Sequence, residues 1–384
     1  SPPPGPGTSG AAMVEGAARR VAFFLPSLGG GGAERVALAT ANHLAGRGHE
    51  VDMLLTEGKG ELVALLDPSV RVIELEASRL LVAVPPLVRY LRQARPDALQ
   101  ALMWPATIIA ILAHRLARSR ARLSVSDHTH YSQHFRHIGD PRQLAAFRWT
   151  ARLFYPRADA RIACSAAAAA DLADASRLPL GAFTVIHSPV SPPPAVASTP
   201  EAEAIWAGAR RRIITVGSMS PVKNHALLLR AVARLDDKDA RLVLLGDGPE
   251  RARLTALADA LGIADRLVMP GFVLDPWPFL ASAQLFVLSS SYEGSPVALA
   301  EAMAAGLRVV STDCVSGPAE LLDGGRFGRL VPCGDEAALA EAMAAAFAAP
   351  HDSAAIRQRA LSIAGPGAIA RYGKVILGEG AEGT

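Results

Sequence analysis

Apolar runs alternate with amphipathic stretches along most of the chain. Residues 21–28 form an apolar run that leads into four glycines, as expected for a strand buried on both faces of a parallel sheet. Residues 34–45 follow with apolar positions at helical spacing, and residues 51–56 form the next apolar run. Strands that alternate with helices in this way predict parallel sheets covered by helices on both faces.

The alternation is interrupted once and then restarts. Residues 188–200 are rich in proline and are the clearest linker in the chain. Beyond them we expect strands at 212–217, 241–246, 267–269, 285–288 and 309–312, helices at 225–235, 250–261 and 335–349, and a last short helix at 369–377. The pattern predicts two Rossmann-like α/β domains, residues 20–195 and 196–365, followed by a C-terminal helix and tail, 366–384. Ligands bind between the carboxyl ends of such sheets, so we expect a cleft between the domains.

Composition narrows the class of protein. Half of the 384 residues are apolar and 20% are charged, which excludes a disordered chain. The net charge of +3 is too small to indicate nucleic-acid binding. Residues 1–12 are rich in Pro, Gly and Ser, and we expect them to be an added remnant before a native start at Met13, with the whole of 1–19 disordered or part of that remnant.

The cysteines and the hydropathy of the chain indicate in which cellular compartment the protein is expected. Cys164, Cys314 and Cys333 are far apart and form no paired motif, which favours the reducing cytosol. The longest apolar run, residues 101–113, is shorter than the roughly 20 residues that a membrane span needs. We therefore expect a cytoplasmic protein, with contact at the inner face of the membrane left open.

A glycine-rich turn joins the first strand to the first helix. Residues 29–32 are glycines, followed by Ala33, Glu34 and Arg35. Glycines allow close backbone approach, and a helix N-terminus offers free N–H groups with a partial positive charge, which suits a diphosphate. The turn is neither a dinucleotide fingerprint nor a P-loop. A tight turn with no ligand is the alternative.

A second turn occupies the same place in the second domain. Gly217 and Ser218 follow its first strand, and Lys223 lies five residues after Ser218. Lysine is rare in this chain, and an ammonium at the mouth of the cleft can neutralise phosphate oxygens. The alternative is a solvated surface lysine.

The third feature is a loop and helix with two carboxylates. Pro296 suits a first helical position after the capping residue Ser295, so we expect the helix to begin at Pro296. Glu293 then lies in the loop before the helix, and Glu301 lies in the second turn. The two carboxylates are staggered along the helix axis and could reach two parts of one elongated ligand.

Together these segments resemble the retaining glycosyltransferases of family 4, which have the two-domain GT-B fold. The signature is Glu293 and Glu301 separated by seven residues within the sequence Ser-Tyr-Glu-Gly-Ser-Pro-Val-Ala-Leu-Ala-Glu. Three further segments support the resemblance: Gly-Gly-Ala-Glu-Arg at 31–35, Val-Gly-Ser-Met-Ser-Pro-Val-Lys-Asn at 216–224 and Leu-Leu-Gly-Asp-Gly-Pro-Glu at 244–250. The resemblance extends from residue 21 to about 377 and implies that the last helix crosses back to the first domain.

The resemblance implies roles for individual residues. Glu293 would bind hydroxyls of the donor sugar, Glu301 would hold the ribose, and Lys223 would bind the diphosphate. His128, after the expected strand 123–126, would lie beside the donor sugar. The expected catalytic residues are thus His128, Glu293 and Lys223, and the expected nucleotide-sugar site comprises Gly31, Gly32, Glu34, Gly217, Ser218, Lys223, Phe272, Val273, Glu293, Gly294, Ser295, Pro296, Val297 and Glu301.

Two details qualify this assignment. The family usually has an arginine where this chain has Ser218, so one positive charge is missing at the phosphates. Pro296 has no N–H, so the amides of Gly31, Gly32 and Val297 are the better donors. His128, His130, His134 and His137 could suggest a metal site, but the family is usually metal-independent, so we expect no metal and no cofactor beyond the nucleotide sugar.

The resemblance also implies a reaction and partners. The expected reaction moves a hexose or N-acetylhexosamine from a nucleotide sugar to a hydroxyl of a glycan or lipid-linked acceptor, with retention of anomeric configuration. The segment Asp-Cys-Val-Ser-Gly-Pro-Ala-Glu at 313–320 resembles bacterial surface-polysaccharide enzymes that use UDP-sugars, and GDP-mannose is the alternative donor. A sugar-nucleotide epimerase and a non-catalytic sugar-nucleotide-binding protein stay open as other classes.

The acceptor side would belong to the first domain. This domain is rich in arginine at 115–122 and 136–161, near Trp149, Phe154 and Tyr155. Such residues could rest on an anionic membrane. A solvated helix face above core aromatics is the other interpretation.

Overall fold

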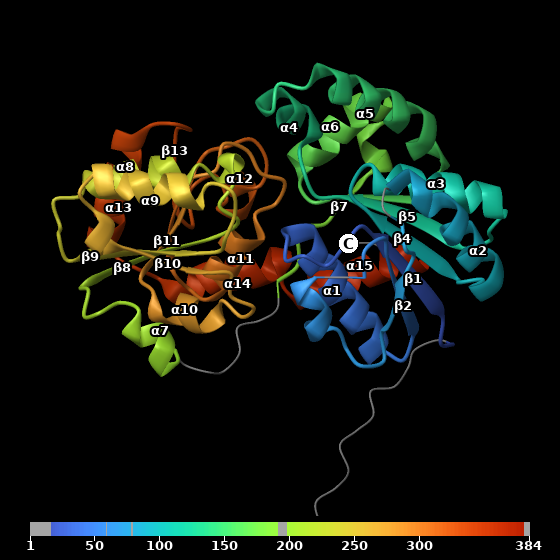
Figure 1. Ribbon diagram of the computed structural model, residues 1–384, viewed down its shortest axis with the longest axis horizontal. Coiled ribbons are helices and arrows are strands. Elements are labelled where there is room, and N and C mark those ends of the chain that lie inside the picture. Colours follow the sequence, from blue (N-terminus) through green and yellow to red (C-terminus); the bar gives the residue numbers. More distant parts are fainter. Residues whose placement is uncertain (1–16, 59, 78–79, 191–197, 380–384) are drawn as a thin grey trace, which may run out of the picture.

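The computed structural model describes residues 17–58, 60–77, 80–190 and 198–379. The predicted break at residue 195, the tail beyond 379 and most of the expected N-terminal remnant lie outside these residues. The described chain forms two α/β domains that lie side by side, each built on a parallel sheet with helices on both faces (Figure 1). The α/β class and the GT-B arrangement expected from the sequence are confirmed.

The sheet of the first domain has seven strands within the described residues, in the order β3-β2-β1-β4-β5-β6-β7. All neighbours are parallel, and β1 pairs with both β2 and β4. The strands are β1 (Arg20–Leu25), β2 (Glu50–Leu55), β3 (Arg71–Glu74), β4 (Ala98–Leu102), β5 (Arg122–Asp127), β6 (Ala160–Ala163) and β7 (Thr184–Val185). The helices are α1 (Gly32–Gly46), α2 (Val84–Ala94), α3 (Ala106–Ala117), α4 (Tyr131–His137), α5 (Pro141–Phe154) and α6 (Ala166–Ser176).

The sheet of the second domain has six strands within the described residues, in the order β10-β9-β8-β11-β12-β13. The strands are β8 (Arg211–Val216), β9 (Ala240–Leu245), β10 (Leu267–Gly271), β11 (Leu285–Leu288), β12 (Arg308–Thr312) and β13 (Arg329–Val331). The helices are α7 (Pro200–Ala204), α8 (His225–Ala233), α9 (Arg251–Ala260), α10 (Trp277–Ser282), α11 (Val297–Ala304), α12 (Pro318–Leu321), α13 (Glu336–Ala348) and α14 (Ser353–Ala364). In both sheets the strand order reverses beside the first strand of the domain, where this architecture forms its ligand crevice.

The final helix, α15 (Pro366–Leu377), leaves the second domain and packs against α1 and β5 of the first (Figure 1). Tyr372 and Ile376 of this helix are fully buried there. The helix begins three residues earlier than the sequence pattern indicated. Pro366 occupies its first turn, where a missing N–H costs nothing, so the Gly-Pro-Gly segment starts the helix and does not break it.

Helix α14 was not predicted from the sequence. Its fully buried side chains include Ala360 and Ala364, which are small, so the apolar periodicity on which such a prediction depends is weak. Among the described residues, none of the helices combines the length and the apolar character that crossing a bilayer requires.

Candidate functional site

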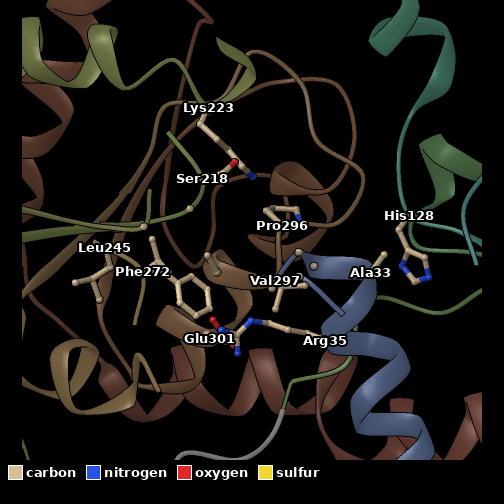
Figure 2. A pocket seen from close by; sticks show the side chains of 18 of the residues that line it. Ala33, Arg35, His128, Ser218, Lys223, Leu245, Phe272, Pro296, Val297 and Glu301 are labelled. Atoms are coloured by element: carbon tan, nitrogen blue, oxygen red, sulfur yellow. The ribbon is translucent and has the colours of Figure 1, made fainter. Parts of the chain in front are cut away.

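A cavity of about 520 Å³ lies between the two domains, and both contribute to its walls (Figure 2). The first domain supplies the turn between β1 and α1 and the segment after β5. The second domain supplies the loops that follow β8, β9, β10 and β11. These loops all follow the carboxyl ends of strands, so the cavity occupies the position where this architecture binds ligands.

Two helix N-termini face each other across the cavity. Gly32 begins α1 and Val297 begins α11. A Cβ atom added to Gly32 would lie 3.2 Å from Cγ2 of Val297, so glycine is what permits this close approach. The first N–H groups of a helix have no partner within it, and residues at both helix starts line this one cavity, which suits an anion such as a diphosphate.

Glu34 does not line the cavity, although it was expected there. Its carboxylate accepts a hydrogen bond from the backbone N–H of Gly31 and contacts the hydroxyl of Ser27. Burial is the main cause that raises the pKa of Glu34. Its role is to cap the first turn of α1, while the next residue, Arg35, lines the cavity.

Lys223 and Glu293 form an ion pair at one end of the cavity. The Lys223 Nζ atom lies 2.7 Å from Oε1 of Glu293, and the two side chains are 22% and 11% exposed. The hydroxyl of Ser290 donates a second hydrogen bond to the same oxygen over 2.6 Å. The side chain of Lys223 also runs past Gly217, where a Cβ would lie 3.5 Å from Cε. Glu293 is therefore held in one orientation with its charge compensated.

Glu301 lies at the other end in a different environment. Its side chain is buried in α11, and burial raises the pKa of its carboxyl to about 7. Arg35 reaches toward it from the first domain (Figure 2), and its charge acts to lower that pKa, whereas Asp275 acts to raise it. Hydroxyl donors of a ligand would favour the ionised form of this buried carboxyl.

His128 lies at the first-domain wall of the cavity, directly after β5. Burial lowers the pKa of its imidazole to about 4, so the ring is neutral at physiological pH. Its Nε2 atom lies 3.2 Å from the hydroxyl of Ser126, and its ring stacks near Tyr372 of α15. Among the described residues, its Nδ1 atom has no hydrogen-bond partner. The neutral ring therefore lies at the cavity wall with one buried nitrogen unpaired among the described residues.

Asp127 anchors the end of the strand that carries His128. Its buried carboxylate accepts hydrogen bonds from the hydroxyls of Tyr131 and Tyr155, over 2.8 and 2.7 Å, and from the backbone N–H of Trp104. Burial raises its pKa to about 6 despite these three donors. The network fixes the backbone at the cavity wall.

The other histidines of this segment have separate partners. His130 lies 3.3 Å from the carboxylate of Asp171 within the first domain. His134 lies 2.8 Å from the hydroxyl of Tyr292, which belongs to the second domain, and the ring of His137 faces the same tyrosine. Within the described residues, no three side chains of His, Cys, Asp or Glu gather as a metal site would require.

The start of α11 differs from the sequence prediction. The helix begins at Val297, with Pro296 as the capping residue, one position later than expected. The hydroxyl of Ser295 accepts a hydrogen bond from the backbone N–H of Ser188, over 3.3 Å, and caps no helix. Gly294 does not line the cavity. A Cβ there would collide with the carbonyl oxygen of His128, so glycine allows this loop to pack directly on the first domain.

Most residues singled out from the sequence meet at this one cavity. Its lining includes Gly31, Gly32, His128, Gly217, Ser218, Lys223, Phe272, Val273, Glu293, Ser295, Pro296, Val297 and Glu301. Sequence reasoning missed several further lining residues, among them Arg35, Glu61, Met103, Thr129 and Asp247, and no local signal marked Glu61 or Met103. Arg35 and Asp247 stand inside the quoted motifs, and Thr129 follows His128, so proximity in the chain was the available signal.

Comparisons with known proteins agree with this geometry. Residues 30–192 match the family model described as Glycosyltransferase Family 4, and residues 210–348 match the model described as Glycosyl transferases group 1. An N-acetylgalactosaminyltransferase of Campylobacter jejuni that acts on a diphospho-undecaprenol substrate is 39% identical over 124 residues, covering 32% of this chain and 34% of that protein. The matches to the first curated relatives span about a third of their length or less.

Longer matches support the same family. The amylovoran biosynthesis glycosyltransferase AmsD of Erwinia amylovora is 25% identical over 295 residues, covering 76% of this chain and 80% of AmsD. The crystal structure of HepE from Anabaena with UDP and glucose superposes with a TM-score of 0.77 at 21% identity, covering 92% of this chain and 98% of HepE. This likeness shows the fold, and the two family models describe its two domains. The chain therefore belongs to glycosyltransferase family 4 and has the GT-B fold.

Proposed function

We propose that this protein is a retaining glycosyltransferase that moves a hexose or N-acetylhexosamine from a UDP-sugar to a hydroxyl of a glycan or lipid-linked acceptor. The observation that carries the proposal is the convergence on one cavity of two helix N-termini and the Lys223–Glu293 pair. Together they offer amide donors, a cation and a sugar-binding carboxylate. A nucleoside diphosphate sugar needs donors and a cation at its diphosphate and an acceptor at its sugar hydroxyls.

The donor can be laid along the cavity by chemistry. Phe272 and Val273 would contact the nucleobase, and Glu301 would accept hydrogen bonds from the ribose hydroxyls. The diphosphate would lie between Lys223 and the two helix starts, and Glu293 would bind hydroxyls of the sugar beside His128. UDP is the favoured nucleotide because HepE was crystallised with UDP-glucose, and GDP-mannose is the alternative.

The mechanism follows from where charge develops. As the bond between the anomeric carbon and the diphosphate oxygen breaks, negative charge grows on the diphosphate. Lys223 and the N–H groups at Gly32 and Val297 would stabilise it with no metal ion. The acceptor oxygen then bonds to the anomeric carbon on the face that the diphosphate leaves, and its proton passes to a diphosphate oxygen. The product keeps the anomeric configuration.

The acceptor side of the proposal includes a membrane surface at α5. Trp149 is 65% exposed and Leu153 is 39% exposed on this helix. Arg142 and Arg152 are exposed on the same helix. Tyr155, by contrast, is fully buried in the core and takes no part. Apolar side chains beside arginines suit the surface of an anionic membrane, where a lipid-linked acceptor would be met.

A thermal-shift screen of sugar nucleotides tests the donor site. We expect UDP-sugars to raise the melting temperature of the wild type more than GDP-mannose does, and to raise that of Glu293→Ala by much less. Absence of any shift with every nucleotide sugar would contradict the proposal. Turnover then separates the classes, since a changed sugar would indicate an epimerase and binding with neither transfer nor hydrolysis would indicate a binding protein. A product of inverted anomeric configuration by NMR would rule out the retaining mechanism.

A further inference from the structure

The segment Asp313–Glu320 follows β12, ends within the short helix α12, and packs against the loop that carries Glu293. Val315 forms a bridge with Tyr292, and its carbonyl accepts a hydrogen bond from the backbone N–H of Glu293 over 3.1 Å. Gly317 has a φ of +91°, and a Cβ there would collide with Pro296. The segment therefore supports the donor loop from the side opposite the cavity.

The last residue of this segment reaches the other domain. One carboxylate oxygen of Glu320 accepts a hydrogen bond from the backbone N–H of Ala166 over 2.9 Å, and the other accepts from Ala167 over 3.2 Å. These are the first two residues of α6 in the first domain. His187, at the end of the first domain, lies 3.3 Å from the same carboxylate. One side chain thus contacts two separate elements across the domain boundary.

These contacts have a clear electrostatic basis. The first N–H groups of a helix have no partner within the helix and carry partial positive charge. The hydroxyl of Ser165 satisfies the N–H of Ala168, and Glu320 satisfies the two before it. Burial opposes ionisation of Glu320, but the contacts with His187, Ala166 and Ala167 outweigh it and hold the pKa of the carboxyl below its ordinary value. The carboxylate is therefore charged when the domains meet.

We propose that Glu320 is a positioning residue that holds the second domain closed on the first, so that the Glu293 loop is pressed against His128. The approach is close, because no space remains for a Cβ at Gly294 beside the carbonyl oxygen of His128. When the cleft opens, the carboxylate of Glu320 moves away from α6, and the N–H groups of Ala166 and Ala167 become hydrated. The bound nucleotide needs both helix starts, so closure and donor binding are coupled.

Three variants of the full chain test the clamp. Glu320→Ala removes it from the second domain, and Glu320→Gln keeps an acceptor oxygen but loses the charge. Ala166→Pro removes one donor from the first domain at a position where proline suits a helix, since the preceding Ser165 is extended. Glu336→Ala is the matched control, because that carboxylate pairs with Arg234 inside the second domain.

The readouts are the radius of gyration of the ligand-free chain by small-angle X-ray scattering and the affinity for UDP by calorimetry. We expect Glu320→Ala to be larger than the wild type, to bind UDP about tenfold more weakly and to contract when UDP is added. Glu320→Gln and Ala166→Pro should each give a radius of gyration and a UDP affinity between those of the wild type and Glu320→Ala. The double variant Glu320→Ala/Ala166→Pro should bind UDP as well as Glu320→Ala alone, because both changes remove the same contact. Wild-type dimensions and UDP affinity in Glu320→Ala would overturn the inference.

The inference rests on the proposed function only for its UDP readout. If the wild type binds no nucleotide, the proposed donor site fails while the scattering comparison still decides whether Glu320 closes the cleft. If Glu320→Ala does not fold, as judged by loss of its cooperative melting transition, the same comparison is made with Ala166→Pro, which leaves the second domain intact. Unchanged dimensions in that variant would overturn the inference.

Discussion

The two ends of the cavity hold carboxylates from the same loop and helix, yet their environments are opposite. Glu293 is paired with Lys223 and receives a hydrogen bond from Ser290 before any ligand arrives. Glu301 is buried, with the pKa of its carboxyl raised to about 7 and Arg35 acting on it from the other domain. One end is charge-balanced in advance, and at the other end we expect a ligand to complete the balance.

This contrast assigns different tasks to the two ends. A preassembled group contributes most to the step where charge moves, because it needs no reorganisation at that moment. A group whose ionisation depends on the ligand contributes mostly to binding. We therefore expect changes at the Glu293 end to affect the rate of transfer and changes at the Glu301 end to affect affinity and its pH dependence.

The largest effect should come from Glu293→Gln. The amide keeps the shape but loses the charge that pairs with Lys223 and that, in the proposed site, would orient the sugar hydroxyls. We expect kcat for donor hydrolysis or transfer to fall about 10²- to 10³-fold with little change in UDP affinity. Glu336→Gln, an exposed carboxylate of the same domain, is the control. A wild-type kcat in Glu293→Gln would remove the distinction between the two ends.

Lys223→Met should have the next largest effect and should distinguish binding of the phosphates from binding of the nucleoside. In the proposed donor site the ammonium lies beside the diphosphate, so its loss should weaken UDP binding about 10²-fold. Uridine, which has no phosphate, should bind as in the wild type. Calorimetry with both compounds checks this, and equal losses for UDP and uridine would place Lys223 outside the phosphate site.

Glu301→Gln tests the ligand-dependent end through pH. The pKa of Glu301 is raised in the folded chain, so the folded state binds more protons than the unfolded state between the ordinary value of 4.5 and about 7. Wild-type stability therefore falls as pH rises through that window, and the loss is complete above it. At pH 8 we expect the Gln variant to be more stable by of order 2 kcal/mol in denaturant unfolding.

The same variant should bind uridine about tenfold more weakly. Wild-type uridine affinity should increase as pH rises through about 7, because the carboxylate accepts hydroxyl donors better than the acid does, and the variant should show no such dependence. Uridine is the better probe because a terminal phosphate itself titrates near pH 6. A pH profile identical in the two proteins would show that Glu301 does not bind the ribose.

The smallest expected effect is an increase in UDP affinity, from a substitution at Ser218. Ser218 is exposed at the cavity wall, where its hydroxyl contacts that of Ser220. Ser218→Arg would supply the charge that the family resemblance leads us to expect at this position, and we expect UDP to bind about three- to tenfold more tightly with uridine unchanged. Ser220→Arg is a neighbouring control. Weaker UDP binding in Ser218→Arg would indicate that Lys223 alone already balances the phosphates.

Element prediction succeeded where a local pattern decides the conformation. The strand expected at 285–288 matches β11, and the strand expected at 309–312 differs from β12 by one residue. The first is a fully apolar run and the second pairs two valines with two small hydroxyl residues, and burial on both faces leaves such short runs few alternatives. Prediction failed for α14 and misplaced the starts of α11 and α15, where proline and small residues blur the apolar period.

The residues of the site show the same difference between features that a local pattern determines and features that it does not. The sequence by itself determined the two glycine-bearing turns, the rare lysine and the spacing of Glu293 and Glu301, because each depends on a few adjacent residues. Only the tertiary structure decided that Arg35, not Glu34, faces the cavity, that His128 is neutral, and that Glu320 reaches α6. These properties depend on burial and on contacts between residues as far apart as Ala166 and Glu320, and no local pattern carries that information.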